Sequence, residues 1–117
     1  MQRDVRAYLN DIIEACEAIE AALTGLDLAG YRSNRLVRSS VEREFIIVGE
    51  AMAALGRLAP QVFAGITQSR RIVDFRNQLT HGYSIVDDAV VWLIAGHDVA
   101  VLREECVQLL GAYQAES

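Results

Sequence analysis

Apolar residues recur every three or four positions along most of the chain, which is the spacing expected for one face of an α-helix. The first apolar stripe covers residues 4–26, where Gly25 and Gly30 indicate the end of the helix and a short loop. The second covers residues 33–58 and stops before Pro60, which suits the first position of a short helical turn. The first half of the chain therefore predicts two long helices joined by a loop.

The second half of the chain contains shorter helical segments. One covers residues 69–81 and is followed by Gly82, which suits the left-handed conformation that ends many helices. Another begins near Asp87, whose carboxylate suits a helix N-terminus, breaks near Gly96 and resumes over residues 98–113. Together these segments predict an all-α fold, an up-and-down antiparallel bundle of four to five helices.

Composition supports a globular protein rather than a disordered or membrane-embedded one. The chain has 117 residues, 52% of them hydrophobic, and one proline, so we expect a single domain over residues 1–117. The longest apolar runs, such as residues 89–95, are too short to cross a bilayer, and the N-terminus does not resemble a signal peptide. We therefore expect a cytoplasmic protein that makes no contact with a membrane.

The two cysteines lie at helical spacing among apolar neighbours. Cys16 follows Ile12 and precedes Ile19, and Cys106 follows Leu102. This environment predicts buried, reduced thiols rather than a metal ligand pair or a disulfide.

Charge is distributed unevenly along the chain. The net charge is −5, which by itself disfavours nucleic-acid binding, and all eleven basic residues are arginines. Both ends are acidic, whereas seven arginines lie in the middle: Arg32, Arg35, Arg38, Arg43, Arg57, Arg70 and Arg71. They could form a patch that holds phosphates, or simply solvated helix faces, and the sequence leaves both readings open.

One arginine occupies an unusual position. Three apolar residues form the buried stripe of segment 69–81: Ile72, Phe75 and Leu79. Arg76 projects only about 40° from Ile72 around a helix, so it lies inside this stripe. A desolvated arginine needs an anionic or carbonyl partner. Arg76 is therefore paired within the fold with an acid such as Glu50 or Asp74, sited at a subunit interface, or lining a polar cleft.

A histidine near this arginine suggests a chemistry. His81 ends the segment, and Asn77, four residues earlier, could hydrogen-bond its ring. A histidine can exchange protons with the 2′-hydroxyl and the leaving 5′-oxygen of RNA, and an arginine can stabilise negative charge on the phosphorus oxygens. No Asp, Glu or His cluster has ligand spacing, so we expect neither a metal site nor a cofactor.

The run Arg76-Asn77 followed by His81-Gly82-Tyr83 resembles the motif of the HepT-like toxins of the HEPN superfamily. The segments 48–51 (Val-Gly-Glu-Ala) and 86–92, from Val86-Asp87 to Trp92, also resemble the family, in the same order and spacing. The chain departs from the family pattern where members often have other residues: at Ile46, at Asp74-Phe75 and at His97-Asp98-Val99.

The resemblance implies a helical HEPN fold and the toxin of a type II toxin–antitoxin pair. It also implies a homodimer in which two Arg-His motifs face one cleft and cleave RNA without metal, with Arg76 and His81 catalytic and Asn77 supporting. The antitoxin would be a minimal nucleotidyltransferase, which in some members adds AMP to the motif tyrosine, here Tyr83. Arg70 and Arg71 are further candidates for contacts with the RNA backbone.

An alternative from a different class also fits the sequence. The chain could be a non-catalytic HEPN module that dimerises and binds a nucleotidyltransferase partner or nucleotides. The presence of Arg76, Asn77, His81 and Tyr83 together favours the nuclease, because a module that only binds has no need of all four.

Overall fold

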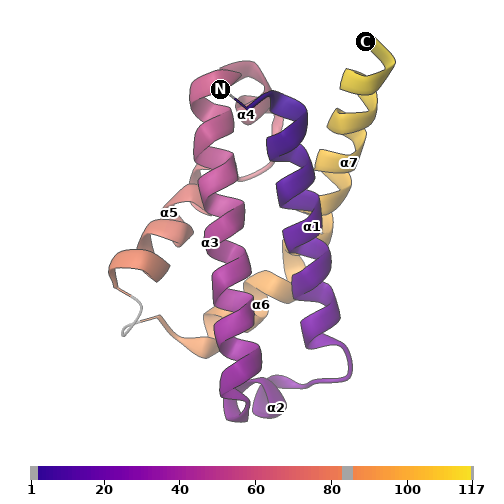
Figure 1. Ribbon diagram of the computed structural model, residues 1–117. Coiled ribbons are helices and arrows are strands. Elements are labelled where there is room, and N and C mark those ends of the chain that lie inside the picture. Colours follow the sequence, from indigo (N-terminus) through magenta and orange to yellow (C-terminus); the bar gives the residue numbers. More distant parts are fainter. Residues whose placement is uncertain (1–2, 83–85, 117) are drawn as a thin grey trace.

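The computed structural model describes residues 3–82 and 86–116, with side chains up to Gln114, and all regular secondary structure in these residues is helical (Figure 1). Seven helices occur in this part of the chain: α1 (Val5–Leu23), α2 (Leu28–Ser33), α3 (Arg35–Leu58), α4 (Pro60–Gly65), α5 (Ser69–His81), α6 (Asp88–His97) and α7 (Val99–Glu116). The predicted all-α class is confirmed, and the helix count exceeds the four to five that were expected. Among these helices, none is both long enough and apolar enough to cross a membrane.

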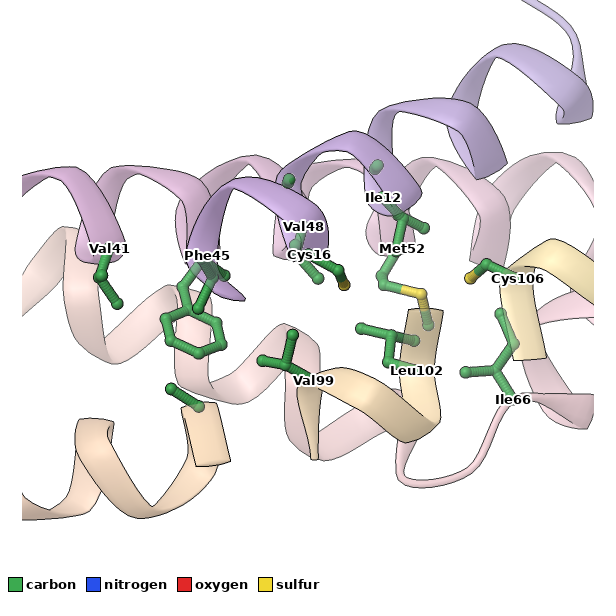
Figure 2. Close-up of a cluster of buried hydrophobic side chains, with 14 of the residues drawn as sticks. Ile12, Cys16, Val41, Phe45, Val48, Met52, Ile66, Val99, Leu102 and Cys106 are labelled. Carbon is green, nitrogen blue, oxygen red and sulfur yellow. The ribbon is translucent and has the colours of Figure 1, made fainter. Parts of the chain in front are cut away.

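Three long helices form the body of the molecule. Helix α1 packs against both α3 and α7 and runs antiparallel to them (Figure 1). Each helix directs an apolar stripe inward, as the spacing predicts. Figure 2 shows part of the resulting core, which includes Ile12 of α1, Met52 of α3 and Leu102 of α7, all buried.

The loop expected between the first two long helices contains a helix of its own. The Asp27 carboxylate caps α2 by accepting a hydrogen bond of 2.8 Å from the backbone N–H of Gly30. Tyr31 is fully buried, and its ring centroid lies 5.6 Å from that of Trp92. A helix of six residues is too short to show a periodic stripe, so the sequence pattern did not reveal it.

The prediction of a left-handed conformation at Gly82 is wrong. Gly82 ends α5 with φ −146° and ψ 35°, which is not left-handed, and its N–H donates to the carbonyl of Gln78. Left-handed residues occur instead at Gly25, after α1, and at Gln68, directly before α5.

Both cysteines are buried and unpaired, as predicted, and both lie in the cluster shown in Figure 2. Burial raises the pKa of the Cys16 thiol from 9.0 to about 12, with smaller contributions from neighbouring groups, chiefly Cys106. Burial likewise raises the pKa of Cys106 to about 12. Because the reactive species is the thiolate, both thiols are chemically inert in the folded protein.

We therefore expect a thiol reagent at pH 8 to label neither cysteine in the native protein and both after denaturation. The raised pKa values also favour the folded state below pH 9, and this contribution is lost as pH rises from 9 towards 12. Mass spectrometry after timed labelling measures the first effect, and thermal melts across this pH range measure the second. Rapid native labelling of either thiol would contradict the packing described.

Candidate active site

Helix α5 carries most of the residues that the sequence singled out, and its start is fixed by contacts with α7. The backbone N–H of Thr67 donates to Glu105 Oε1 at 3.0 Å, and its hydroxyl donates to Glu105 Oε2 at 2.6 Å. Gln68 then adopts a left-handed conformation, and its side-chain oxygen accepts a hydrogen bond of 3.1 Å from Arg71. These contacts set where the helix begins and the direction in which it leaves.

Helix α5 packs mainly on α3, and the two helices approach closely at one point. The rings of Phe45 and Phe75 meet edge to face with centroids 5.2 Å apart, and Leu79 is buried. One turn along α3, Gly49 faces Arg76. A Cβ atom at Gly49 would lie 2.6 Å from Arg76 Cγ, closer still to Arg76 Cβ, and 3.5 Å from Arg76 Cα. The helices can approach this closely only because position 49 has no side chain.

Arg76 is half-buried on the face of α5 that meets α3, as its position in the apolar stripe predicted. Its Nε atom is buried and has no hydrogen-bond partner among the described residues. Within residues 3–82 and 86–116, its guanidinium also forms no ion pair, so the pairing with Glu50 or Asp74 that the sequence allowed is not formed. An arginine in this state can still accept an anion.

His81 and Asn77 are both exposed near the C-terminal end of α5. In the described chain no hydrogen bond joins them, and the hydroxyl of Thr80 donates instead to the carbonyls of Arg76 and Asn77 at 3.1 and 3.2 Å. Five residues separate Arg76 from His81, which places them about 140° apart around the helix. The two side chains therefore do not converge within one copy of the chain.

Of the remaining candidate site residues, the structure describes the positions of two and not that of the third. Arg70 and Arg71 are exposed in the first turn of α5. Tyr83 lies outside the described residues, so its position relative to His81 is not part of this structure. In the described part of the chain, no group of three or more His, Cys, Asp or Glu side chains is arranged to hold a metal ion.

An ionic cluster surrounds the start of α6, the next described helix after the motif. Asp87 caps α6 by accepting from the N–H of Ala89 and lies 3.8 Å from the guanidinium of Arg32. Asp88 lies 3.8 Å from Nε of Arg38. Two of the seven mid-chain arginines are thus matched by carboxylates, which reduces the basic patch that the sequence allowed.

Two further titratable groups lie beside this cluster. Burial, assisted by Asp88 and opposed by Arg38, raises the pKa of Glu42 above its ordinary value. Burial also raises the pKa of Tyr31, whose hydroxyl has no hydrogen-bond partner among the described residues. This grouping could not be predicted from the sequence pattern, because its members come from α2, α3 and α6.

A groove of about 510 Å³ lies between α5, α3 and the corner where α6 meets α7. Its walls are largely apolar, with Phe75 on one side and Val90 and Ile94 on the other, and Arg71 contributes to its lining. Beside it α6 exposes Leu93 to 63%. An exposed apolar surface could have been predicted here from the sequence, because α6 is apolar on nearly all sides and such helices are normally covered by other parts of a protein.

Comparison with known proteins identifies relatives over nearly the whole chain. The model of the ribonuclease HepT-like family matches residues 12–109. The "Putative RNase MJ1380" of Methanocaldococcus jannaschii is 29% identical over 104 residues, covering 89% of this chain and 94% of that protein. The "Probable ribonuclease HepT" of Thermococcus cleftensis is 29% identical over 107 residues, covering 88% and 93%. No solved structure matches the chain. These relatives agree with the resemblance seen in the motif.

Proposed function

Since the chain belongs to the ribonuclease HepT-like family, we propose that it is an endoribonuclease that cleaves RNA without a metal ion. The observation that carries this proposal is the state of Arg76. Its guanidinium is held against α3, is half-buried and has no ion-pair partner in the described residues. A phosphate is the anion that such a group, presented by a ribonuclease, is suited to bind.

The reaction uses the nucleophile that RNA itself carries. His81 takes the proton of the 2′-hydroxyl, and the 2′-oxygen attacks the adjacent phosphorus. The bond to the 5′-oxygen breaks, that oxygen takes up the proton that His81 gained, and the product ends in a 2′,3′-cyclic phosphate. Arg76 stabilises the negative charge that grows on the non-bridging oxygens. Asn77 supports His81, and Arg70 and Arg71 contact the RNA backbone.

Two copies of the chain complete the site. Because Arg76 and His81 project in different directions from one α5, a second motif across a shared cleft supplies the group that the first copy lacks. The exposed apolar face of α6, with Val90 and Leu93 beside the groove, supports a symmetric interface there. The dimer thereby covers a helix that is apolar on nearly all sides.

Cellular control follows from the same site. The protein acts as the toxin of a type II pair, and its antitoxin is a minimal nucleotidyltransferase that transfers AMP to Tyr83. Tyr83 follows His81 by two residues in the motif, so AMP on Tyr83 adds a phosphate to the segment that carries Arg76 and His81. Such a phosphate competes for the donors that otherwise bind RNA.

We expect His81→Ala and Arg76→Ala each to reduce RNA cleavage by at least about a hundredfold and to abolish growth inhibition. Their melting temperatures should stay close to that of the wild type, because neither side chain makes an ion pair in the described structure. The matched control is Arg57→Ala, which removes an exposed arginine of α3 and should leave the activity unchanged. Cleavage should persist in EDTA and leave 2′,3′-cyclic phosphate ends, and loss of activity on chelation would overturn the mechanism.

The dimer predicts the effect of a charge on α6. Leu93→Asp should yield monomers at tens of micromolar protein, where the wild type sediments as a dimer. Leu36→Asp is the control, since Leu36 is 84% exposed at the start of α3, away from the groove. A dimer that tolerates Leu93→Asp and dissociates with Leu36→Asp would place the interface elsewhere.

The AMP transfer predicts a single modified residue. Mass spectrometry of the chain after co-expression with its nucleotidyltransferase should find AMP on Tyr83. Tyr83→Phe should keep cleavage activity and become insensitive to the catalytic activity of that partner. AMP on another residue, or silencing of the Phe variant through catalysis, would show that Tyr83 is not the switch.

A further inference from the structure

Gly49 lies at a position where a glycine is costly for the helix that contains it. It is buried near the middle of α3, a helix of 24 residues. A glycine inside a helix is less stable than an alanine because it loses more backbone freedom on folding. Its backbone is not left-handed, so no conformational demand explains it. The explanation must be the space that a side chain would occupy.

That space is filled by the stem of Arg76. A Cβ atom at position 49 would overlap Arg76 Cβ and would lie 2.6 Å from Cγ, with the α5 backbone at Cα only 3.5 Å away. The overlapping atoms are the first two of the arginine side chain, so no rotation of its flexible end relieves the overlap. Any side chain at position 49 therefore displaces α5 from α3. By contrast, a Cβ atom at Gly111 of α7 meets nothing within 4 Å.

The close approach also determines where the guanidinium lies. The Arg76 stem rests on the α3 backbone, and its Nε is buried there without a partner in the described chain. Because no ion pair in these residues holds the guanidinium, the packing of the stem is what directs it. A shift of α5 would move the charged group by a similar amount.

We propose that Gly49 is a positioning residue for Arg76, an inference that rests on the proposed function. It contacts no RNA and acts by letting α5 lie against α3, which places the guanidinium for the transition state. Misplacement of a charge-stabilising group by about 1 Å can reduce a rate by a hundredfold. The absence of a side chain at Gly49 thus contributes to the catalytic geometry, although Gly49 itself is buried in the core.

The kinetic test compares two glycine-to-alanine variants. Gly49→Ala should reduce kcat by about a hundredfold and leave KM within about twofold, because the affected contact matters most in the transition state. Gly111→Ala should leave both unchanged. Assays are run at a temperature where circular dichroism shows each variant folded. Unchanged kcat in Gly49→Ala, or an equal loss in Gly111→Ala, would overturn the proposal.

A stability test examines the contact without any activity. Gly49→Ala should lower Tm by about 4 °C or more in the wild-type background. Gly49→Ala should lower Tm by a similar amount in the Arg76→Ala background, because alanine at position 76 keeps the overlapping Cβ atom. In the Arg76→Gly background, where Cβ and Cγ are absent, Gly49→Ala should raise Tm. Gly111→Ala should raise Tm for the same reason, since alanine is favoured over glycine in a helix.

The two tests separate the inference from the proposed function. If the wild type cleaves no RNA, the function fails, and the melts still report whether Gly49 accommodates Arg76. If Gly49→Ala folds only together with Arg76→Gly, the contact is supported. If Gly49→Ala lowers Tm equally in the Arg76→Gly background, the space at position 49 accommodates a group other than the Arg76 side chain, and the inference is wrong.

Discussion

The close contact between α3 and α5 at Gly49 and Arg76 is the constraint on which the site depends. It helps to hold α5 in place, although this helix has little buried surface of its own. Leu79 is its one buried residue, and its other apolar residues are half-exposed. The edge-to-face pair of Phe45 and Phe75 supports the same approach one turn away. Because α5 packs mainly on α3, a change in α3 at this contact shifts the residues that α5 carries.

This contact places a charge where no group in residues 3–82 or 86–116 pairs with it. Desolvating part of an arginine without a partner destabilises the fold, and in ordinary packing such a residue acquires a carboxylate. Elsewhere in the described chain this is what occurs: Arg103 of α7 binds Glu20 of α1 at 2.6 Å. Among the described residues Arg76 has no such partner, although Asp74 is close to it in sequence and Glu50 is on the facing helix. The difference between the two arginines is the structural argument for an external anion.

Much of the fold could be predicted from the sequence because long amphipathic helices have a strong period. The limits of α5 follow from its apolar stripe and from the break after His81, and the break between α6 and α7 was expected near Gly96. The short helix α2 was missed, because one turn and a half carries no period. The left-handed conformation expected at Gly82 was wrong, since a glycine permits that conformation without requiring it.

The site could be predicted only as a set of residue types. The position of Arg76 in an apolar stripe followed from helical geometry, but its lack of a partner depends on how α3 and α5 meet. The role of Gly49 was hidden for the same reason, because its neighbour in space is 27 positions away in sequence. The groove beside α6 also arises from tertiary packing, because residues of α3 line it together with residues of α5, α6 and α7.

The central claim is that Arg76 and His81 serve a cleavage in which RNA supplies its own nucleophile. The most direct measurement uses a short RNA whose cleavage site has been mapped and a matched copy with a single 2′-deoxynucleotide on the 5′ side of that bond. The account predicts that the purified protein, in EDTA, cuts the all-ribose strand and leaves the substituted bond intact. Cleavage of the substituted bond at a comparable rate would show that water or another group attacks the phosphorus, and would contradict the account.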